Sequence, residues 1–176
     1  MKENKQILIS ELGSVTGGIV AGILLASITT QLEQIPGLLI LLPGFLAMRG
    51  NINSTLSARL GTKLHLGTIK PELKKNKKLN KEIMITLLKS LIVSTTVCLG
   101  AILINYFLTQ QINYGLFLVG IVAGIISTII SVPLTITSEF TVFKKGYDPD
   151  DIMGPVISTI GDVVSLFSII IGVMIL

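Results

Sequence analysis

Five long apolar stretches dominate the chain and constrain its fold more than any other feature. They cover residues 7–30, 36–60, 83–108, 114–143 and 152–176. A helix needs about 20 mostly apolar residues to cross a bilayer core of roughly 30 Å, and each stretch is long enough. Only 14% of the residues are charged, whereas a soluble domain carries about 25%. The sequence therefore predicts an all-α integral membrane protein, with residues 1–176 forming one domain of five transmembrane helices.

Basic residues fall on alternate loops, which predicts the orientation of the helices. The N-terminal tail, the loop between the second and third stretches and the loop before the fifth are basic; their lysines are Lys2, Lys5, Lys63, Lys70, Lys74, Lys75, Lys77, Lys78, Lys81, Lys144 and Lys145. The other two loops, residues 31–35 and 109–113, have no Lys or Arg. Basic loops stay on the cytoplasmic side. We therefore expect a cytoplasmic N-terminus and an external C-terminus.

Several classes of function are disfavoured by what the sequence contains. The basic loop has no aromatic residue on which bases could stack, so contact with anionic lipid headgroups is favoured over nucleic-acid binding. No HExxH, Walker or dinucleotide-binding motif follows the required pattern, and the single Cys98 has no partner for a disulfide within the chain. We expect a membrane protein that is not an enzyme.

Asp162 is the single charged residue of the C-terminal run, residues 153–176, and falls near its middle. A carboxylate at that depth costs at least about 2.5–3.5 kcal/mol unless it meets water, a cation or a partner. Ser158 and Ser165 share one helix face with Asp162, and Thr159 lies beside them. This polar stripe with an acidic centre predicts an ion path.

The second apolar stretch contains a polar stripe of its own. Gly50 and Asn51 should weaken or locally unwind a helix at that depth. Its residues share one helix face and are Asn51, Ser54, Thr55, Ala58 and Thr62. Carbonyl and amide oxygens suit a hard cation such as Mg²⁺. The stripe therefore indicates a surface that opposes Asp162, with hydrogen bonding between helices as the alternative.

Three charged residues inside the stretches have more than one interpretation. Arg49 either pairs with a buried acid or extends toward the membrane interface. Glu11, about one turn inside the first stretch, is either a cation ligand at the inner mouth or a partner for a Lys or Arg. Glu139, near the cytoplasmic end of the fourth stretch, is expected at the interface.

Asp148, Asp150 and Asp151 lead into the last stretch. We expect them to cap and complement its N-terminus, with Pro155 in the first turn. They would also raise the local concentration of cations at the inner mouth.

Two segments resemble a known family. They are GNINSTLSARL at residues 50–60 and DPDDIMGP at residues 148–155, which STIGD follows at residues 158–162. They resemble the transmembrane domain of the MgtE magnesium transporters and, still more, the related solute carrier family 41. The similarity extends over nearly the whole chain, in the order of the motifs and the number of spans.

The resemblance implies a five-helix domain that pairs as a homodimer, with a pore on the dimer axis lined by the second and fifth helices. The family's pore aspartate matches Asp162, and the residue four before it matches Ser158. Gly50 and Asn51 match the glycine–asparagine pair of the second helix. Asp162 would be the central ligand of Mg²⁺, or of another divalent ion such as Mn²⁺ or Co²⁺, helped through water by Ser158, Thr159, Asn51 and Thr55.

The chain departs from the resemblance in two ways. MgtE proteins usually carry cytoplasmic regulatory domains before the membrane part, whereas this chain starts almost at its first span. The longer eukaryotic relatives fuse two membrane halves, and this chain corresponds to one. A separately encoded regulatory subunit would fit the first difference.

The sequence leads to three functional hypotheses. The main one is a divalent cation channel or transporter in a prokaryotic cell membrane, with membrane lipid and a second copy of the chain as partners. The second is a Na⁺- or H⁺-coupled Mg²⁺ exchanger in which Glu11, Glu139 or Arg49 takes part in coupling. The third is a membrane interaction protein that keeps the fold without transport.

Overall fold

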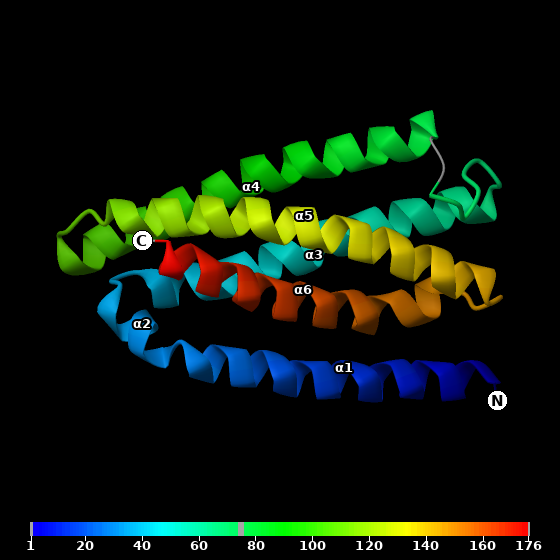
Figure 1. Cartoon of the computed structure of the whole chain (residues 1–176), viewed down its shortest axis with the longest axis horizontal. Coiled ribbons are helices and arrows are strands. Elements are labelled where there is room, and N and C mark those ends of the chain that lie inside the picture. The colour runs from blue at the N-terminus through cyan, green and yellow to red at the C-terminus, as the bar shows by residue number, and fades with distance from the viewer. Residues whose placement is uncertain (1, 74–75, 176) are drawn as a thin grey trace.

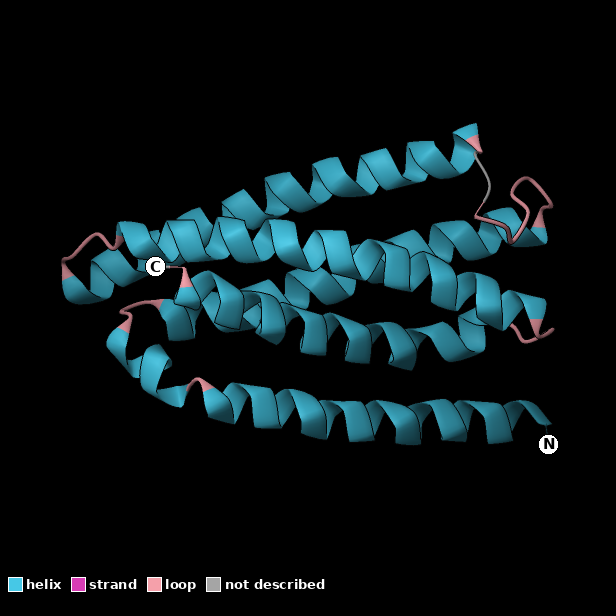
Figure 2. Ribbon diagram, in the orientation of Figure 1, coloured by secondary structure: helices cyan, strands magenta, loops and turns pink. Residues whose placement is uncertain are grey.

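The computed structural model describes residues 2–73 and 76–175, and nearly all of this part is helical. The helices are α1 (Lys2–Ser27), α2 (Thr29–Gln34), α3 (Leu38–His65), α4 (Lys77–Thr109), α5 (Tyr114–Lys144) and α6 (Pro149–Met174). Figure 2 shows helices joined by loops, and the described ranges contain no strand. The prediction of an all-α fold is confirmed.

Three of the long helices begin at a side chain that caps their first free N–H groups. Asn76 accepts a hydrogen bond from the Lys78 N–H at 2.9 Å before α4, and Asn113 accepts one from the Gly115 N–H at 3.0 Å before α5. Asp148 does the same before α6, accepting from the Asp150 N–H at 3.0 Å. Such caps satisfy donors that have no partner inside the helix. The capping expected of Asp148 is therefore confirmed.

The long helices run back and forth along one axis (Figure 1). The N-terminus, the α3–α4 loop and the α5–α6 turn lie at one end, and the C-terminus lies at the other. The described basic segments therefore share one end of the bundle. Lys74 and Lys75 are outside the described residues.

Four helical segments of the described chain are long and apolar enough to cross a membrane. They are Gln6–Ser27 in α1 and the whole of α4, α5 and α6. The chain is therefore a multi-pass membrane protein. α3 has 28 residues, but polar groups in its second half lower its hydropathy, and it is not among the four.

The bundle packs around α5 and α6. α6 contacts α1, α3 and α5, and α5 also contacts α3 and α4. α1 and α4 lie on opposite outer sides, with the other long helices between them (Figure 1). The exposed surface of α1 is rich in large apolar side chains such as Leu12, Ile19 and Ile23. Such a surface suits lipid, because apolar groups there remain out of water.

Glycines set the distance between some helices. A Cβ added to Gly120 or Gly124 of α5 would collide with Cys98 or Ser94 of α4, and one at Gly17 of α1 would collide with Thr159 of α6. Small residues at these places let two helices approach closely.

Two local features differ from the expectation. The first stretch does not continue as one helix to residue 30, because α1 ends at Ser27 and the short α2 follows. The chain then turns at Gly37, whose φ of 88° is in the left-handed region that favours glycine. Pro155 is in the second turn of α6 rather than in its first, because α6 begins at Pro149.

Candidate functional site

The polar stripe of α3 lies on the surface of the folded chain. Its residues are all exposed and are Asn51, Ser54, Thr55, Ala58 and Thr62. The Thr55 hydroxyl donates to the Asn51 carbonyl at 2.8 Å, and the Thr62 hydroxyl to the Ala58 carbonyl at 2.9 Å. The helix is continuous through Gly50 and Asn51, so the expected unwinding there is wrong. We call these five residues the α3 polar face.

On α6, Ser158 is exposed and Asp162 is half-buried. Ser165, which the spacing places on the same stripe, is fully buried inside the bundle. The polar stripe of α6 is therefore accessible from outside the bundle at Ser158 and Asp162 and buried at Ser165. Among the described residues, Glu82 is the acid in every ion pair. Asp162 therefore has no basic partner in the part of the chain that the structure describes.

α3 and α6 approach each other where both helices have a glycine. A Cβ added to Gly161 would lie 3.6 Å from the backbone nitrogen of Gly50. The next residue along each helix is Asp162 and Asn51, respectively. The crossing therefore brings the acidic stripe of α6 alongside the α3 polar face.

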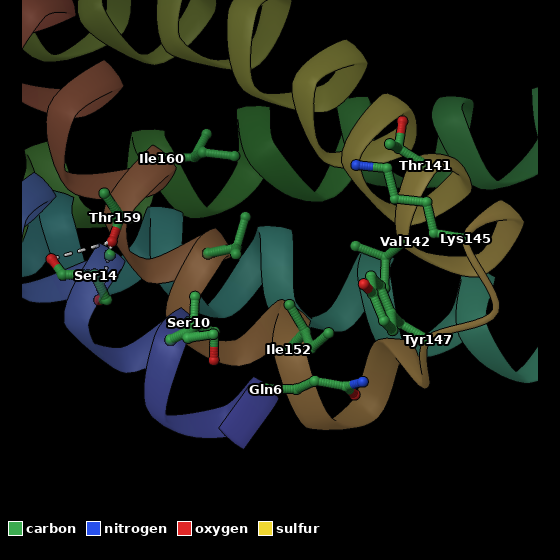
Figure 3. Close-up of a pocket in the computed structure, with 13 residues that line it drawn as sticks. Gln6, Ser10, Ser14, Thr141, Val142, Lys145, Tyr147, Ile152, Thr159 and Ile160 are labelled. Atoms are coloured by element: carbon green, nitrogen blue, oxygen red, sulfur yellow. Dashed lines mark hydrogen bonds between the residues drawn. The ribbon is translucent and has the colours of Figure 1, made fainter. Parts of the chain in front are cut away.

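Thr159 points toward α1. Its hydroxyl lies 2.9 Å from Ser14 Oγ and 3.0 Å from the Pro155 carbonyl oxygen. Figure 3 shows it on the wall of a cavity of about 520 Å³, which lies between α1 and the adjoining parts of α5 and α6. The structure therefore separates Thr159 from the exposed part of the stripe that contains Ser158 and Asp162.

Arg49 is fully buried and faces α4 and α5. Its Nη1 donates to Ser90 at 2.8 Å and to Thr128 at 2.6 Å. Its Nη2 donates to the Gly124 carbonyl at 2.7 Å and to Ser94 at 3.3 Å. The guanidinium thus neither pairs with an acid nor extends to the interface, and both expectations are wrong. Its planar set of donors instead joins three helices through hydroxyls and a carbonyl.

Glu139 is fully buried between α3 and α6, although the sequence indicates an interfacial position. Its Oε2 accepts a hydrogen bond from the Ser57 hydroxyl of α3. Its Oε1 has no hydrogen-bond partner in the described part of the chain. Ser57 and Gly61, which both contact this carboxyl, are one helical turn apart, but only the fold indicates their partner.

A second buried acid, Glu82 of α4, was not singled out by the sequence. Arg59 Nε lies 3.0 Å from its Oε2, and Lys63 Nζ forms an ion pair with its Oε1. The sequence does contain a signal for this cluster. Arg59 and Lys63 are four residues apart and so share one face of α3, and Glu82 lies near the start of the next helix. These ion pairs join the two helices at the basic end of the bundle.

Glu11 lies in α1, and Asp148, Asp150 and Asp151 lie at the start of α6. Glu11 and Asp150 are exposed, and Asp151 is half-buried in the first turn of α6. No three His, Cys, Asp or Glu side chains within the described ranges are grouped to hold a metal ion. One copy of the chain therefore provides isolated or paired carboxylates, with hydroxyls and backbone oxygens around them.

Comparisons with known proteins match the amino-acid sequence to one family. A family model described as MgtE, divalent cation transporter, matches residues 42–172. The chain is 23% identical to solute carrier family 41 member 2 of Homo sapiens over 171 residues, which cover 92% of this chain and 29% of the relative. It is 21% identical to member 3 of Rattus norvegicus over 168 residues, which cover 91% of this chain and 35% of the relative.

The chain is also 21% identical to member 2 of Gallus gallus over 167 residues, which cover 90% of this chain and 28% of the relative. It thus spans about a third or less of the length of these curated relatives. No solved structure matches the chain. The matched range includes Gly50, Asn51, Ser158 and Asp162. Because the family model matches most of the chain, the protein belongs to the MgtE family of divalent cation transporters.

Proposed function

We propose that the chain carries Mg²⁺ across a prokaryotic cell membrane as a homodimer, through a pore lined by α3 and α6. The observation that carries the proposal is the α3 polar face, which is exposed beside the half-buried Asp162 in a multi-pass membrane protein. Its family transports divalent cations.

An exposed polar face is unfavourable against lipid, because its polar groups would lose hydrogen bonds to water. It is tolerated where it lines a water-filled path or packs on protein. A two-fold axis beside α3 and α6 would place the polar faces of two copies opposite each other. α3 then becomes a fifth span, shielded from lipid on its polar side.

Asp162 is the central ligand in this proposal. Two copies would bring two carboxylates near the axis, and a cation between them would offset their repulsion. Mg²⁺ holds its water shell tightly, so Ser158, Asn51 and Thr55 would act mainly through bound water. Thr159 does not contact the cation directly in this proposal, because its hydroxyl lies against Ser14.

The basic end of the bundle would face the cytoplasm, as the positive-inside rule requires. A membrane potential that is negative inside then favours uptake of a divalent ion by about 4.6 kcal/mol per 100 mV. Mn²⁺ shares the charge of Mg²⁺ and its preference for oxygen ligands, and Co²⁺ shares the charge, so the proposal includes both as further cargo.

The test is Mg²⁺ flux into proteoliposomes that contain a Mg²⁺-sensitive dye. Asp162→Asn keeps the size of the side chain and removes its charge, so we expect it to lose flux. Glu33→Gln makes the same chemical change at an exposed position of α2, at the opposite end of the bundle from the basic loops, and should keep flux. Equal flux in Asp162→Asn and wild type would refute the role of Asp162.

Two further outcomes separate the alternatives. Flux that requires an imposed Na⁺ or H⁺ gradient would favour coupled exchange over a channel. Absence of flux in the wild type would refute transport by this chain alone, and would favour a role in membrane interaction or the need for a regulatory subunit.

A further inference from the structure

Glu139 has an unusual environment for a carboxyl group. Its side chain is fully buried, and one oxygen is held by the Ser57 hydroxyl. The other oxygen, Oε1, has no hydrogen-bond partner among the described residues. A buried polar atom without a partner is costly, so this oxygen is available to accept a ligand.

The free oxygen faces a space that Gly61 of α3 leaves open. The position that a Cβ would occupy on Gly61 is 3.0 Å from Glu139 Oε1 and 3.6 Å from Asp150 Oδ1. Two carboxylates from α5 and α6 therefore border the same small volume against α3. A side chain of any size at residue 61 would fill it.

A cavity of about 180 Å³ adjoins this space. Its wall includes Ser57 and Asp150, which belong to the cluster, and Ser54 and Ala58, which belong to the α3 polar face. The cluster is thus not isolated in the core. It is connected along α3 to the surface that we propose as the pore lining.

The charge around the cluster is mainly negative. The titratable groups that act electrostatically on Glu139 are Asp150 of α6, Asp148, which caps that helix, and His65 of α3. The His65 ring is engaged elsewhere, at 3.0 Å from the Gly61 carbonyl oxygen and edge-on to Phe143. The basic side chains Arg59 and Lys63 are held by Glu82. Carboxylate oxygens without a basic partner attract a cation.

We propose that Glu139 and Asp150, with Ser57 in support, bind a divalent cation in the space beside Gly61. The identity of the cation rests on the proposed function. Mg²⁺ binds oxygen at about 2.0–2.1 Å, so direct contact with both carboxylates requires the Glu139 and Asp150 side chains to move toward the ion. The site lies at the basic end of the bundle and would hold the ion between the cytoplasm and the pore centre at Asp162.

The test measures binding directly in the purified full-length protein. Asp162→Asn is the background, so that the pore centre does not contribute. Mn²⁺ is the probe, and the loss of the free-ion signal in electron paramagnetic resonance reports binding. We expect Glu139→Gln and Asp150→Asn each to weaken Mn²⁺ binding by about tenfold or more.

Gly61→Ala gives a second kind of evidence, because it keeps every charge and only fills the space. We expect it to weaken binding like the charge variants. Gly100→Ala in α4 is its matched control, since a Cβ there would have nothing within 4 Å and Gly100 does not line the adjoining cavity. Asp151→Asn is the matched charge control on the same helical turn as Asp150, and no atom of Asp151 is among the nearest neighbours of the space. Both controls should bind Mn²⁺ nearly as the background protein does.

Two results would contradict the proposal of a cation site beside Gly61. One is background protein that binds no Mn²⁺. The other is binding that Glu139→Gln and Gly61→Ala leave unchanged while both proteins remain folded by size-exclusion chromatography. Either can occur while the wild type still transports Mg²⁺ through Asp162, so failure of this site is distinguishable from failure of the proposed function. Asp150 is exposed, so Asp150→Asn tests the site without disturbing the core.

Discussion

Gly161 of α6 lies against the backbone of Gly50 of α3. A Cβ on Gly161 would stand 3.6 Å from the Gly50 nitrogen and 3.7 Å from its Cα. This is ordinary van der Waals contact, so one methyl group fits there without movement of the Gly50 backbone. The crossing sets how closely Asp162 and Asn51 approach each other.

This close crossing predicts that stability and Mg²⁺ flux depend sharply on the size of the side chain at residue 161. We expect Gly161→Ala to fold and transport like the wild type, and Gly161→Leu to force α3 and α6 apart. Overpacking of this kind costs about 1–3 kcal/mol. Thermal unfolding in detergent and Mg²⁺ flux would both report it. Gly22→Leu, where a Cβ would meet nothing within 4 Å, should change neither, and equal effects at both glycines would contradict the prediction.

Replacement of Arg49 by lysine should destabilise the fold. One ammonium group lacks the fork of donors that reaches Ser90, Thr128 and the Gly124 carbonyl together. We expect Arg49→Lys to lower the free energy of unfolding by about 2 kcal/mol or more, because a buried charge loses hydrogen bonds. Arg59→Lys, at a side chain that is 40% exposed, should cost much less. Similar melting temperatures for the two variants would argue against the network.

Glu82 should matter for stability rather than for transport. Glu82→Gln removes the charge that holds Arg59 and Lys63, and we expect a loss of about 1–3 kcal/mol in the free energy of unfolding. The flux of the protein that remains folded should stay near that of the wild type. A selective loss of flux, with the melting temperature unchanged, would instead place Glu82 in the transport path.

Accessibility to a water-soluble thiol reagent should distinguish the proposed pore from lipid-facing surface. The native Cys98 is fully buried and should not react. We expect Thr55→Cys and Ser158→Cys to be modified in membranes, and Mg²⁺ to slow the reaction. Ile92→Cys, at an apolar position of α4 that is 65% exposed, should stay unmodified because the thiolate that reacts does not form in lipid. Rapid modification at Ile92→Cys would show that exposure alone governs the reaction.

The sequence predicted the helices well because length and apolar content are local properties. The stretch at residues 114–143 ends one residue before α5 does, and α4 begins six residues before the stretch at residues 83–108 and ends one residue after it. The polar face of α3 was also predicted, because residues three and four apart lie on one side of a helix.

The contacts of single polar residues were harder to predict, because they depend on which helices become neighbours. Arg49 finds hydroxyls on α4 and α5, residues far away in the chain. The burial of Glu139 depends on Ser57 and Gly61 of α3 and on the start of α6. Neither arrangement follows from spacing within one helix. The position of Thr159 likewise depends on α1, which Gly17 allows to approach.

The packing of α1 has a consequence for synthesis of the protein. α1 is the first helix of this chain to be made, yet its main contact is α6, which begins only at Pro149. Contacts so far apart in sequence form slowly, because a long loop must close first. During translation α1 would therefore remain in the bilayer, with its apolar surface against lipid, until α6 is inserted. Truncation before α6 would leave α1 without its main partner, even though every residue of α1 is intact.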